Sequence, residues 1–417
     1  MPAKPGSGIC PLSASPNCKP SREEKTGPAL YIPASSLYVH IPFCKSKCDY
    51  CDFFSLPLDT AEIPARYLDA ALAEIACHRE KGCLAPLKTL YIGGGTPSLF
   101  SAAQISRLVS GIAGIVPFEP DCEITLEANP DDIAPPYLDG LRQAEIRRLS
   151  LGIQSLSKNA LCSVHRRSNA ERCLEALDCV RENWPGRLSC DLIAGVPGET
   201  PASFLKGLKT LAGYGPEHIS LYAITVTEGT SLYRKVKAGL VPNPEELAET
   251  LWLAGRDYLE QEGWRQYEVS NFAKPGAECR HNLTYWQSES YIGAGSGAAG
   301  TLYRRDGSAF RYTNTTDVSG YLEQQTNREI EEISRETAQF EYLMMGFRTR
   351  HGVSSKRFFE RFGVPLEKRI GAESGAFAAW EKQGLAAQHN EAAAETRYAL
   401  TAEGLLFLNR FLEELMD

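Results

Sequence analysis

Six short runs rich in β-branched and aromatic residues recur along the first half of the chain, and segments with helical periodicity separate them. The apolar positions Leu68, Leu72 and Ile75 show the helical spacing, and a similar stripe lies between residues 174 and 180. The six runs are SLYVHI (36–41), KTLYIGG (88–94), CEITLE (122–127), RRLSLGI (147–153), LSCDLIAG (188–195) and HISLYAIT (218–225). Strands that alternate with helices predict an α/β fold with a parallel sheet, either doubly wound or curled toward a barrel.

This alternation stops after about Thr225, and the rest of the chain has a different organisation. Residues 1–34 are rich in Pro, Ser and Lys without an apolar run, which predicts a flexible tail and no signal peptide. We expect the parallel domain over 35–300, a connector over 301–332 and a small α-rich domain with one hairpin, of winged-helix type, over 333–417. In the last segment Thr401 is the expected N-cap of a helix with an apolar face. That face consists of Leu405, Leu408, Phe411, Leu412 and Leu415.

Charge and cysteine content exclude several classes of protein. The formal net charge of -8 argues against a sequence-independent hold on nucleic acid, which requires a basic surface. No apolar run approaches the roughly 18 residues of a membrane span. Thirteen cysteines, an odd number scattered along the chain, favour free thiols in a reducing cytoplasm over a disulfide framework.

Three cysteines directly follow the first predicted strand. Cys44, Cys48 and Cys51 have the spacing C-x3-C-x2-C, one ligand short of an ordinary zinc or 4Fe–4S site. Three thiolates can hold a cubane cluster by three irons and leave the fourth iron open for an exchangeable ligand. The alternative is a zinc site that His40 completes. Tyr50 is placed either to stack on a ring bound at the open iron or simply to pack.

Other unusual residues also follow the strands, where ligands of parallel sheets gather. The sequence GGGTP (93–97) lacks the lysine and the spacing of a phosphate loop, but its glycines let a backbone approach a ligand closely. Arg166 could clamp a carboxylate. At later strand ends lie Glu127, Gln154, Asp191, Tyr222 and Ala223. Each residue alone could be a buried cap or a solvated charge, but together they outline a ligand with a carboxylate, an amine, a ribose and a ring, as in S-adenosylmethionine.

The motifs YVHIPFCKSKCDYCDF, GGGTPS, LEANP, LGIQSL and DLIAGVPGET, in this order, resemble the oxygen-independent coproporphyrinogen III oxidase family of radical S-adenosylmethionine proteins. The resemblance runs from about Leu37 to the C-terminus. It implies a partial (βα)6 TIM-like barrel followed by the family's C-terminal domain. It also implies that Cys44, Cys48 and Cys51 bind a 4Fe–4S cluster, which reduces the sulfonium of S-adenosylmethionine. The residues matching the family's S-adenosylmethionine contacts are Tyr38, Tyr50, Gly94, Gly95, Thr96, Glu127, Gln154, Arg166, Asp191 and Ala223.

Two features resemble the heme-chaperone branch of this family, the HemW-like proteins. Phe53 stands where the oxidase carries a fourth cysteine, and the motif H-N-x-x-Y-W is present as HNLTYW (281–286). One departure is Ala299, at a position where the family often has histidine. The alternative remains a radical enzyme that decarboxylates the propionates of coproporphyrinogen III.

Heme is therefore a candidate cofactor, with His281 as the expected iron ligand and Cys279 as its rival. Tyr285 and Trp286 could offer flat apolar surface to a porphyrin. His281 and Asn282 could instead satisfy buried backbone groups. The partners that the resemblance implies are heme or a porphyrinogen, a heme-acceptor protein and an electron donor for the cluster.

Overall fold

The computed structural model describes residues 31–58, 62–323, 327–391 and 395–416. The predicted N-terminal tail lies outside the described residues except for 31–34. Within the described ranges no disulfide links the cysteines. None of the helices in these ranges is both long and apolar enough to cross a bilayer.

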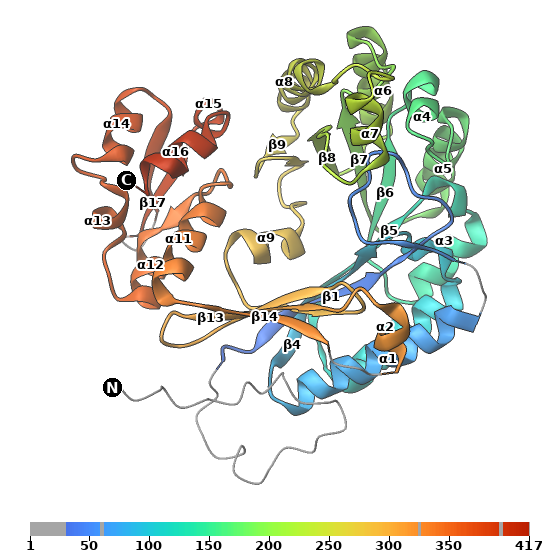
Figure 1. Cartoon of the computed structure of the whole chain (residues 1–417), viewed down its shortest axis with the longest axis horizontal. Helices are drawn as coiled ribbons and strands as arrows, with labels where there is room; N and C mark the ends of the chain where they lie inside the picture. The colour runs from blue at the N-terminus through green and yellow to red at the C-terminus, as the bar shows by residue number, and fades with distance from the viewer. Residues whose placement is uncertain (1–30, 59–61, 324–326, 392–394, 417) are drawn as a thin grey trace.

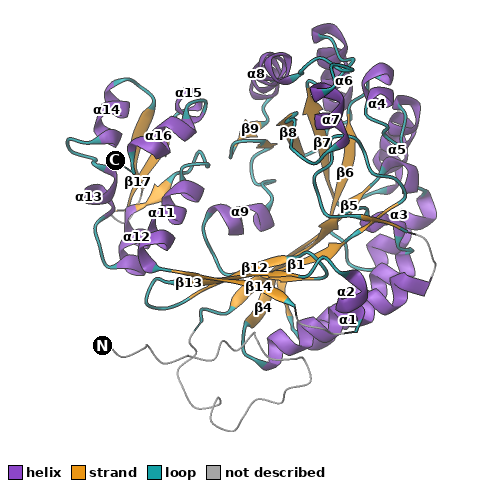
Figure 2. Cartoon of the chain, in the orientation of Figure 1, coloured by secondary structure: helices purple, strands orange, loops and turns teal. Residues whose placement is uncertain are grey.

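The six predicted strands all form and lie side by side in sequence order (Figures 1 and 2). They are β1 (Ala34–Ile41), β4 (Leu84–Gly94), β5 (Phe118–Ala128), β6 (Arg148–Gln154), β7 (Arg187–Ala194) and β8 (His218–Ala223). Each pairs with the next in parallel. The sheet curls into an open arc, so the expectation of a partial barrel is confirmed.

Helices connect the strands and cover the outer face of the arc (Figure 1). Local sequence starts them: Ser101 caps α2 in a capping box with Gln104, and Thr200 caps α6 with Pro201 in the first turn. Most of their apolar faces pack on the sheet in one large core, while α7 and parts of α4 and α8 pack in a smaller cluster. The helices are α1 (Glu62–Glu80), α2 (Ala102–Ile115), α3 (Pro135–Gln143), α4 (Lys158–Ser163), α5 (Ala170–Asn183), α6 (Pro201–Gly213), α7 (Ser231–Lys237) and α8 (Glu245–Gln261), with the 3-10 turns η2 (Pro97–Leu99) and η3 (Pro130–Asp132).

Segments that follow Thr225 pair with the two edges of the arc. Strand β11 (Ile292–Ala294) runs parallel to β1, while β10 (Asn271–Ala273) runs antiparallel to β8 and to β9 (Arg265–Gln266). Helix α9 (Arg280–Trp286) lies in the opening between β4 and the C-terminal part (Figure 1). The sequence correctly indicated a break in rhythm here, but these short edge strands were not anticipated.

Residues 301–332, expected to be a connector, carry most of a three-stranded antiparallel sheet. Its strands are β12 (Ala299–Tyr303), β13 (Ala309–Asn314) and β14 (Arg328–Ile333), and α10 (Val318–Leu322) lies between the last two. Leu302, Phe310 and Tyr312 are buried in the main core. The sheet thus packs directly on the barrel.

The C-terminal part has a separate aromatic core and a three-stranded sheet in the order β15-β17-β16. Its elements are α11 (Arg335–Gly346), β15 (Val353–Ser354), α12 (Ser355–Phe362), α13 (Leu366–Ile370), α14 (Ala376–Lys382), β16 (Ala386–Glu391), β17 (Glu395–Leu400), α15 (Ala402–Leu405) and α16 (Leu408–Glu414). Thr401 caps α15, as predicted. The prediction of a single final helix was wrong, because the helix is interrupted at Leu406 and Phe407, which are exposed. The two short helices that result bring all five predicted apolar residues into the core.

Candidate functional site

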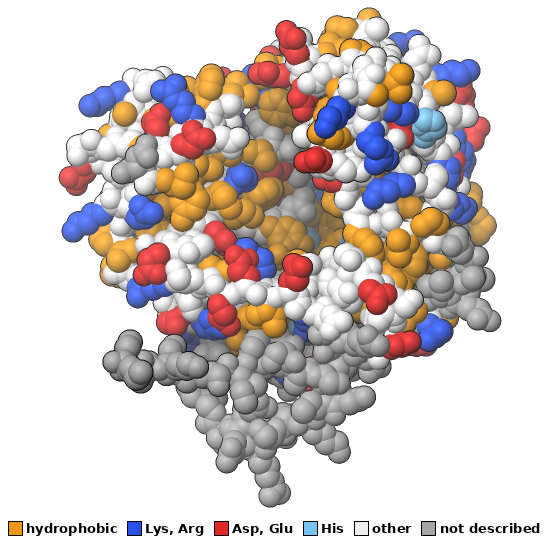
Figure 3. Space-filling view, viewed as in Figure 1, with side chains coloured by type: hydrophobic (Ala, Val, Ile, Leu, Met, Phe, Trp, Pro, Cys, Tyr) orange, Lys and Arg blue, Asp and Glu red, His pale blue; other side chains and the backbone are white. Residues whose placement is uncertain are grey.

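A cavity of about 480 Å³ opens at the carboxyl ends of the strands. The molecular surface is hollowed where the arc opens toward the C-terminal part (Figure 3). The three cysteines and every predicted S-adenosylmethionine contact except Ala223 line this cavity, so the structure brings the cysteine loop, the glycine loop and the strand-end residues to one place. Tyr222 lines the cavity and Ala223 does not, because neighbouring strand residues point to opposite faces.

The walls of the cavity also contain polar residues that the sequence reasoning missed. Along β5 to β8 every second residue lines it, and most of these residues are polar. The missed residues are Thr125, Arg148, Ser150, Ser189, His218 and Ser220. The signal was present as polar residues at alternate positions of otherwise apolar strands.

The three cysteines lie on one loop beside the cavity. Cys44 ends β2 (Phe43–Cys44), which pairs with β3 (Leu56–Pro57), and the N–H of Cys51 donates to the carbonyl of Cys48 at 3.1 Å. All three side chains are half-buried. Burial, together with the neighbouring Cys48 and Cys44, raises the pKa of the Cys51 thiol. A bound cation would reverse this shift, so the donor set fits an iron cluster.

The zinc alternative does not fit the hydrogen bonds of His40. Its Nδ1 lies 2.8 Å from the hydroxyl of Tyr38, and its Nε2 lies 3.1 Å from the carbonyl oxygen of Phe54. Both ring nitrogens are thus engaged, and no group of three or more His, Cys, Asp or Glu side chains in the described ranges is arranged around a single ion. Thiolates that each bind a different iron of a cubane have no need to converge on one point.

Asp49 fixes the cysteine loop to two other segments, the turn after α4 and helix α7. Its N–H donates to the carbonyl of Val164 at 3.1 Å, and its carbonyl accepts from the N–H of Leu232 at 2.7 Å. Its carboxylate accepts from His165 at 2.7 Å and from Lys235 at 2.5 Å. The loop is therefore ordered before any cofactor binds, which lowers the entropic cost of binding.

The glycine loop packs closely against the strand that leads to the cysteines. A Cβ atom at Gly94, where φ is +116°, would lie 2.5 Å from the ring of His40, and one at Gly95 would lie 2.6 Å from the carbonyl oxygen of Phe43. The N–H groups of Gly94, Gly95 and Thr96 all donate within the protein. The groups of this loop that could meet a ligand ammonium are therefore its carbonyls.

Two buried carboxyl groups face the cavity. Glu127 accepts hydrogen bonds from the hydroxyl of Tyr91 at 2.8 Å and from the N–H of Gly94 at 3.0 Å. Burial, and then the neighbouring Asp191, raises the pKa of Glu127 to about 7. Burial raises the pKa of Asp191 to about 6. Both groups can change charge near neutral pH when a cationic ligand arrives.

Arg166 supplies a positive charge beside these carboxyl groups. Its Nη2 donates to the carbonyl of Gly152 at 2.7 Å, while its buried Nε has no hydrogen-bond partner within the described ranges. A Cβ atom at Gly152 would lie 2.9 Å from Gln154 and 3.0 Å from Arg166, so this glycine makes room for both. An incompletely bonded guanidinium in a cavity fits an anionic ligand group such as a carboxylate. Tyr50 packs on an apolar cluster, as the packing interpretation predicts, and it also lines the cavity, while its stacking on a bound ring stays a prediction.

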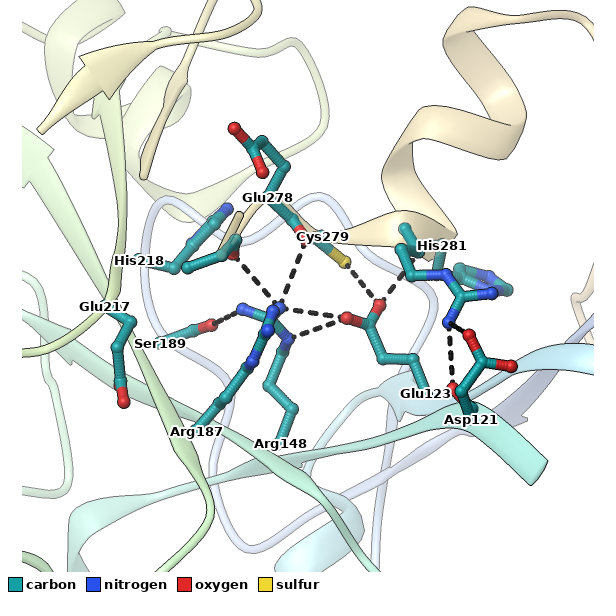
Figure 4. Close-up of polar contacts among 12 residues, drawn as sticks. Asp121, Glu123, Arg148, Arg187, Ser189, Glu217, His218, Glu278, Cys279 and His281 are labelled. Atoms are coloured by element: carbon teal, nitrogen blue, oxygen red, sulfur yellow. Dashed lines mark hydrogen bonds and ion pairs between the residues drawn. The ribbon is translucent and has the colours of Figure 1, made fainter. Parts of the chain in front are cut away.

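A buried ion pair lies at the inner end of the cavity (Figure 4). Arg148 is 1% exposed and donates from Nη2 to Glu123 at 2.9 Å and to the carbonyls of Ala277 and Glu278 at 3.1 and 3.2 Å. Glu123 in turn accepts from the N–H of His281 at 3.3 Å. The pair therefore ties the segment before α9 to β5 and β6.

His281 itself is 1% exposed and fully hydrogen-bonded. Its Nδ1 lies 2.8 Å from Oγ1 of Thr89, its Nε2 lies 2.7 Å from the hydroxyl of Tyr285, and its ring stacks on Tyr91. Burial lowers its pKa to about 3, so the ring is neutral. The hydrogen bonds favour a structural role for the ring of His281, although its partners are side-chain hydroxyls and not the backbone groups that the sequence predicted. An iron ligand would have to break one of these bonds.

The other residues predicted to contact heme differ in whether they reach the cavity. Asn282 and Tyr285 line the cavity, whereas Trp286 does not, and Ala299 begins β12. The thiol of Cys279 is 3.6 Å from Glu123, and its burial, followed by that carboxylate, raises its pKa to about 12. Cys279 is thus a protonated thiol in this arrangement.

Comparison with known families matches two parts of the chain. Residues 38–211 match the radical SAM superfamily, and residues 333–407 match the HemN C-terminal domain. The first match begins within β1 and ends within α6, and it includes the cysteine loop. The second begins at the end of β14 and covers the elements from α11 to α15.

Individual proteins match over most of the chain. The heme chaperone HemW of Haemophilus influenzae is 32% identical over 92% of this chain and 98% of its own length. The heme chaperone HemW of Bacillus subtilis is 33% identical over 80% of this chain and 88% of its own. The solved structure of coproporphyrinogen III oxidase (HemN) from Escherichia coli has a TM-score of 0.74 at 24% identity, covering 91% of this chain and 89% of that one. The last likeness concerns the fold alone.

Proposed function

Because the chain belongs to the HemW heme-chaperone family of radical SAM proteins, we propose that it binds heme and passes it to an acceptor protein. It also holds a 4Fe–4S cluster and S-adenosylmethionine in the cavity at the strand ends. The observation that carries the proposal is the match to HemW along nearly the whole of both chains.

In this proposal Cys44, Cys48 and Cys51 are the cluster ligands. The cluster, when bound, supplies the electron that reduces the sulfonium of S-adenosylmethionine. Thr96 donates to the thiol of Cys44 at 3.4 Å and Arg166 contacts that of Cys48 at 3.6 Å. Such hydrogen bonds to sulfur raise the potential of a cluster and thereby control how readily it gives up its electron.

The predicted contacts at the strand ends and in the glycine loop bind S-adenosylmethionine. Arg166 holds its carboxylate, and the glycine-loop carbonyls with Glu127 accept from its ammonium group. Asp191 and Gln154 bind the ribose of S-adenosylmethionine, while Tyr38 and Tyr50 contact other parts of the same ligand. Ala223 contributes through its backbone, since its side chain points away. Depth within the cavity limits the access of water to the reacting group.

The location and partners belong to the same proposal. Unlinked cysteines and a thiol-bound cluster suit a reducing cytoplasm. In this proposal the heme acceptor and the electron donor are two separate proteins that bind this chain.

The test is a comparison of two ligands on anaerobically reconstituted protein. The proposal expects stoichiometric binding of hemin, transfer of that hemin to apomyoglobin as a general acceptor, and no consumption of coproporphyrinogen III. Conversion of coproporphyrinogen III without hemin binding would replace the chaperone with the oxidase as the function of this chain.

A further inference from the structure

The cysteine loop contains one buried carboxylate. Asp49 directly follows Cys48 and is the only acidic residue between Cys44 and Cys51, and its side chain is 9% exposed. A buried carboxylate needs a cationic or hydrogen-bonding partner, because burial removes its hydration. The partners of Asp49 therefore decide how much negative charge the loop carries beside the predicted cluster.

Lys235 on α7 supplies the positive charge that Asp49 needs. Its Nζ lies 2.5 Å from Oδ2 of Asp49, and its side chain is 26% exposed. Residues 229–244 contain no Asp or Glu, so Lys235 has no acidic neighbour in its own segment. It pairs instead with a residue 186 positions away in the sequence. Because both groups are largely shielded from water, this ion pair is screened much less than an exposed one.

His165 completes the environment of the carboxylate. Its Nδ1 lies 2.7 Å from Oδ2 of Asp49, to which it donates, and 3.4 Å from Nζ of Lys235. The side chain of His165 is 68% exposed, so water screens any charge on the imidazole more strongly than the charge on Lys235. Lys235 is therefore the principal electrostatic partner of Asp49.

Helix α7 also holds the cysteine loop through its backbone and its apolar face. The N–H of Leu232 donates to the carbonyl of Asp49 at 2.7 Å, and Tyr50 packs against the apolar group that includes Leu232. Thr230 caps the helix, which fixes its first turn. In Figure 1 the loop that follows β2 passes beside α7. The ammonium group of Lys235 thus has a defined place next to the loop.

On these grounds we infer that Lys235 is a positioning residue for the cluster. Its pairing with Asp49 fixes the cysteine loop against α7 and cancels the carboxylate charge beside Cys48, and it thereby sets the reduction potential of the cluster. The inference rests on the proposed function, since it requires that the three cysteines hold a 4Fe–4S cluster. The potential of such a cluster depends on the net charge around it, because a nearby negative charge opposes the addition of an electron. The ion pair therefore makes the cluster easier to reduce than an uncompensated Asp49 would.

The experiment is an anaerobic redox titration of the reconstituted full chain without S-adenosylmethionine, followed by the electron paramagnetic resonance signal of the reduced cluster. A pH of about 8 keeps carboxyl groups of ordinary pKa ionised. Lys235→Met removes the positive charge and leaves that of Asp49 uncompensated. Its equilibrium constant for reduction should fall about tenfold, which equals a potential lower by about 59 mV for one electron. Asp49→Asn removes the negative charge instead and should raise the potential by a similar amount.

The opposite signs of these two shifts distinguish charge compensation from a purely structural role. Both variants break the same ion pair, so a loosened loop alone would move the potential in one direction in both. The double variant Lys235→Met/Asp49→Asn should return close to the wild-type potential, and Lys235→Arg, which keeps the charge, should retain it. The matched control is Lys237→Met, which removes the same charge from an exposed position on α7 and should leave the potential unchanged.

Iron and acid-labile sulfide are measured in every variant. If Lys235→Met holds no cluster, Asp49→Asn decides, because asparagine still accepts a hydrogen bond from Lys235 and keeps the backbone bonds of the loop. A potential in Asp49→Asn at or below that of wild type would overturn the inference. Equal shifts in Lys235→Met and Lys237→Met would also overturn it. A wild-type chain that holds no 4Fe–4S cluster would instead overturn the cluster assignment in the proposed function.

Discussion

The guanidinium of Arg166 touches the thiol of Cys48, with Nη1 3.6 Å from Sγ, while its Nη2 bonds to the carbonyl of Gly152 at 2.7 Å. One side chain thus links the predicted cluster loop to the strand end where the ligand carboxylate is expected. Substitutions can separate these two roles, because a cluster ligand must be a thiolate and Arg166 is not one.

Each cysteine of the loop should be needed for the cluster. Alanine substitution of Cys44, Cys48 or Cys51 should abolish it, whereas the wild-type chain should hold about four irons and four sulfides. The measurement is iron and acid-labile sulfide per chain after anaerobic reconstitution. Cys162→Ala, which changes an exposed cysteine outside the loop, is the control and should retain the full cluster. Stoichiometric zinc without sulfide in the wild type would contradict the assignment.

Arg166→Ala should weaken binding of S-adenosylmethionine while leaving the cluster intact. The expected loss is roughly 1.5–3 kcal/mol, the usual contribution of a hydrogen bond to a charged group. Equilibrium binding by calorimetry measures it, with Arg142→Ala on the exposed side of α3 as the control. An unchanged affinity in both Arg166→Ala and Asp191→Ala would remove these residues from the site.

The affinity for S-adenosylmethionine should increase as the pH rises through about 7. Glu127 has its pKa raised to about 7 in the ligand-free chain, and only the ionised carboxylate accepts well from a ligand ammonium. Binding measured across this range should therefore tighten, and Glu127→Gln should remove the change in affinity centred near pH 7 while leaving that of Asp191 near pH 6. A wild-type affinity that is flat through pH 7 would argue against contact with Glu127.

Stability without the ligand should show the opposite pH dependence. The folded-state pKa of Glu127, about 7, lies above its ordinary value of 4.5, so the folded chain holds this proton more tightly than the unfolded one. This contribution is complete below pH 4.5 and is lost as the pH rises through 7. The difference in unfolding free energy between wild type and Glu127→Gln should therefore shift against wild type over this window in urea titrations. A difference that is constant with pH would contradict the raised pKa.

The buried pair of Arg148 and Glu123 should show strong coupling. Arg148→Met leaves Glu123 buried without its charge partner, which typically costs about 3–5 kcal/mol. In urea unfolding, the double variant Arg148→Met/Glu123→Leu should lose much less unfolding free energy than the summed losses of the two single variants. The exposed pair of Arg181 and Asp178 on α5 serves as the control, and its disruption should cost less than about 1 kcal/mol. Additive single effects at Arg148 and Glu123 would contradict the coupling.

Much of the barrel could be predicted from the sequence because its strands are buried on both faces. A run such as LSCDLIAG has a high strand propensity and also contains the polar residues that line the cavity, so both can be predicted from a few adjacent positions. The sheet β12–β14 could not be predicted, because its strands are only partly apolar and become ordered by packing on the barrel core. The state of His281 depends on Thr89, which lies 192 residues away, and no local pattern reports such a partner.

The pairing of β1 with β11 has a consequence for how the protein is made. Leu37 leaves the ribosome early, but its partner Ile292 is among the later residues to emerge. Until then the first strand presents bare backbone groups on one side, and β8 waits similarly for β10. Such distant pairings are slow to form because a long loop must close first. During translation the nascent chain therefore passes through a stage in which the cysteine loop lies on an arc whose two edges are not yet paired.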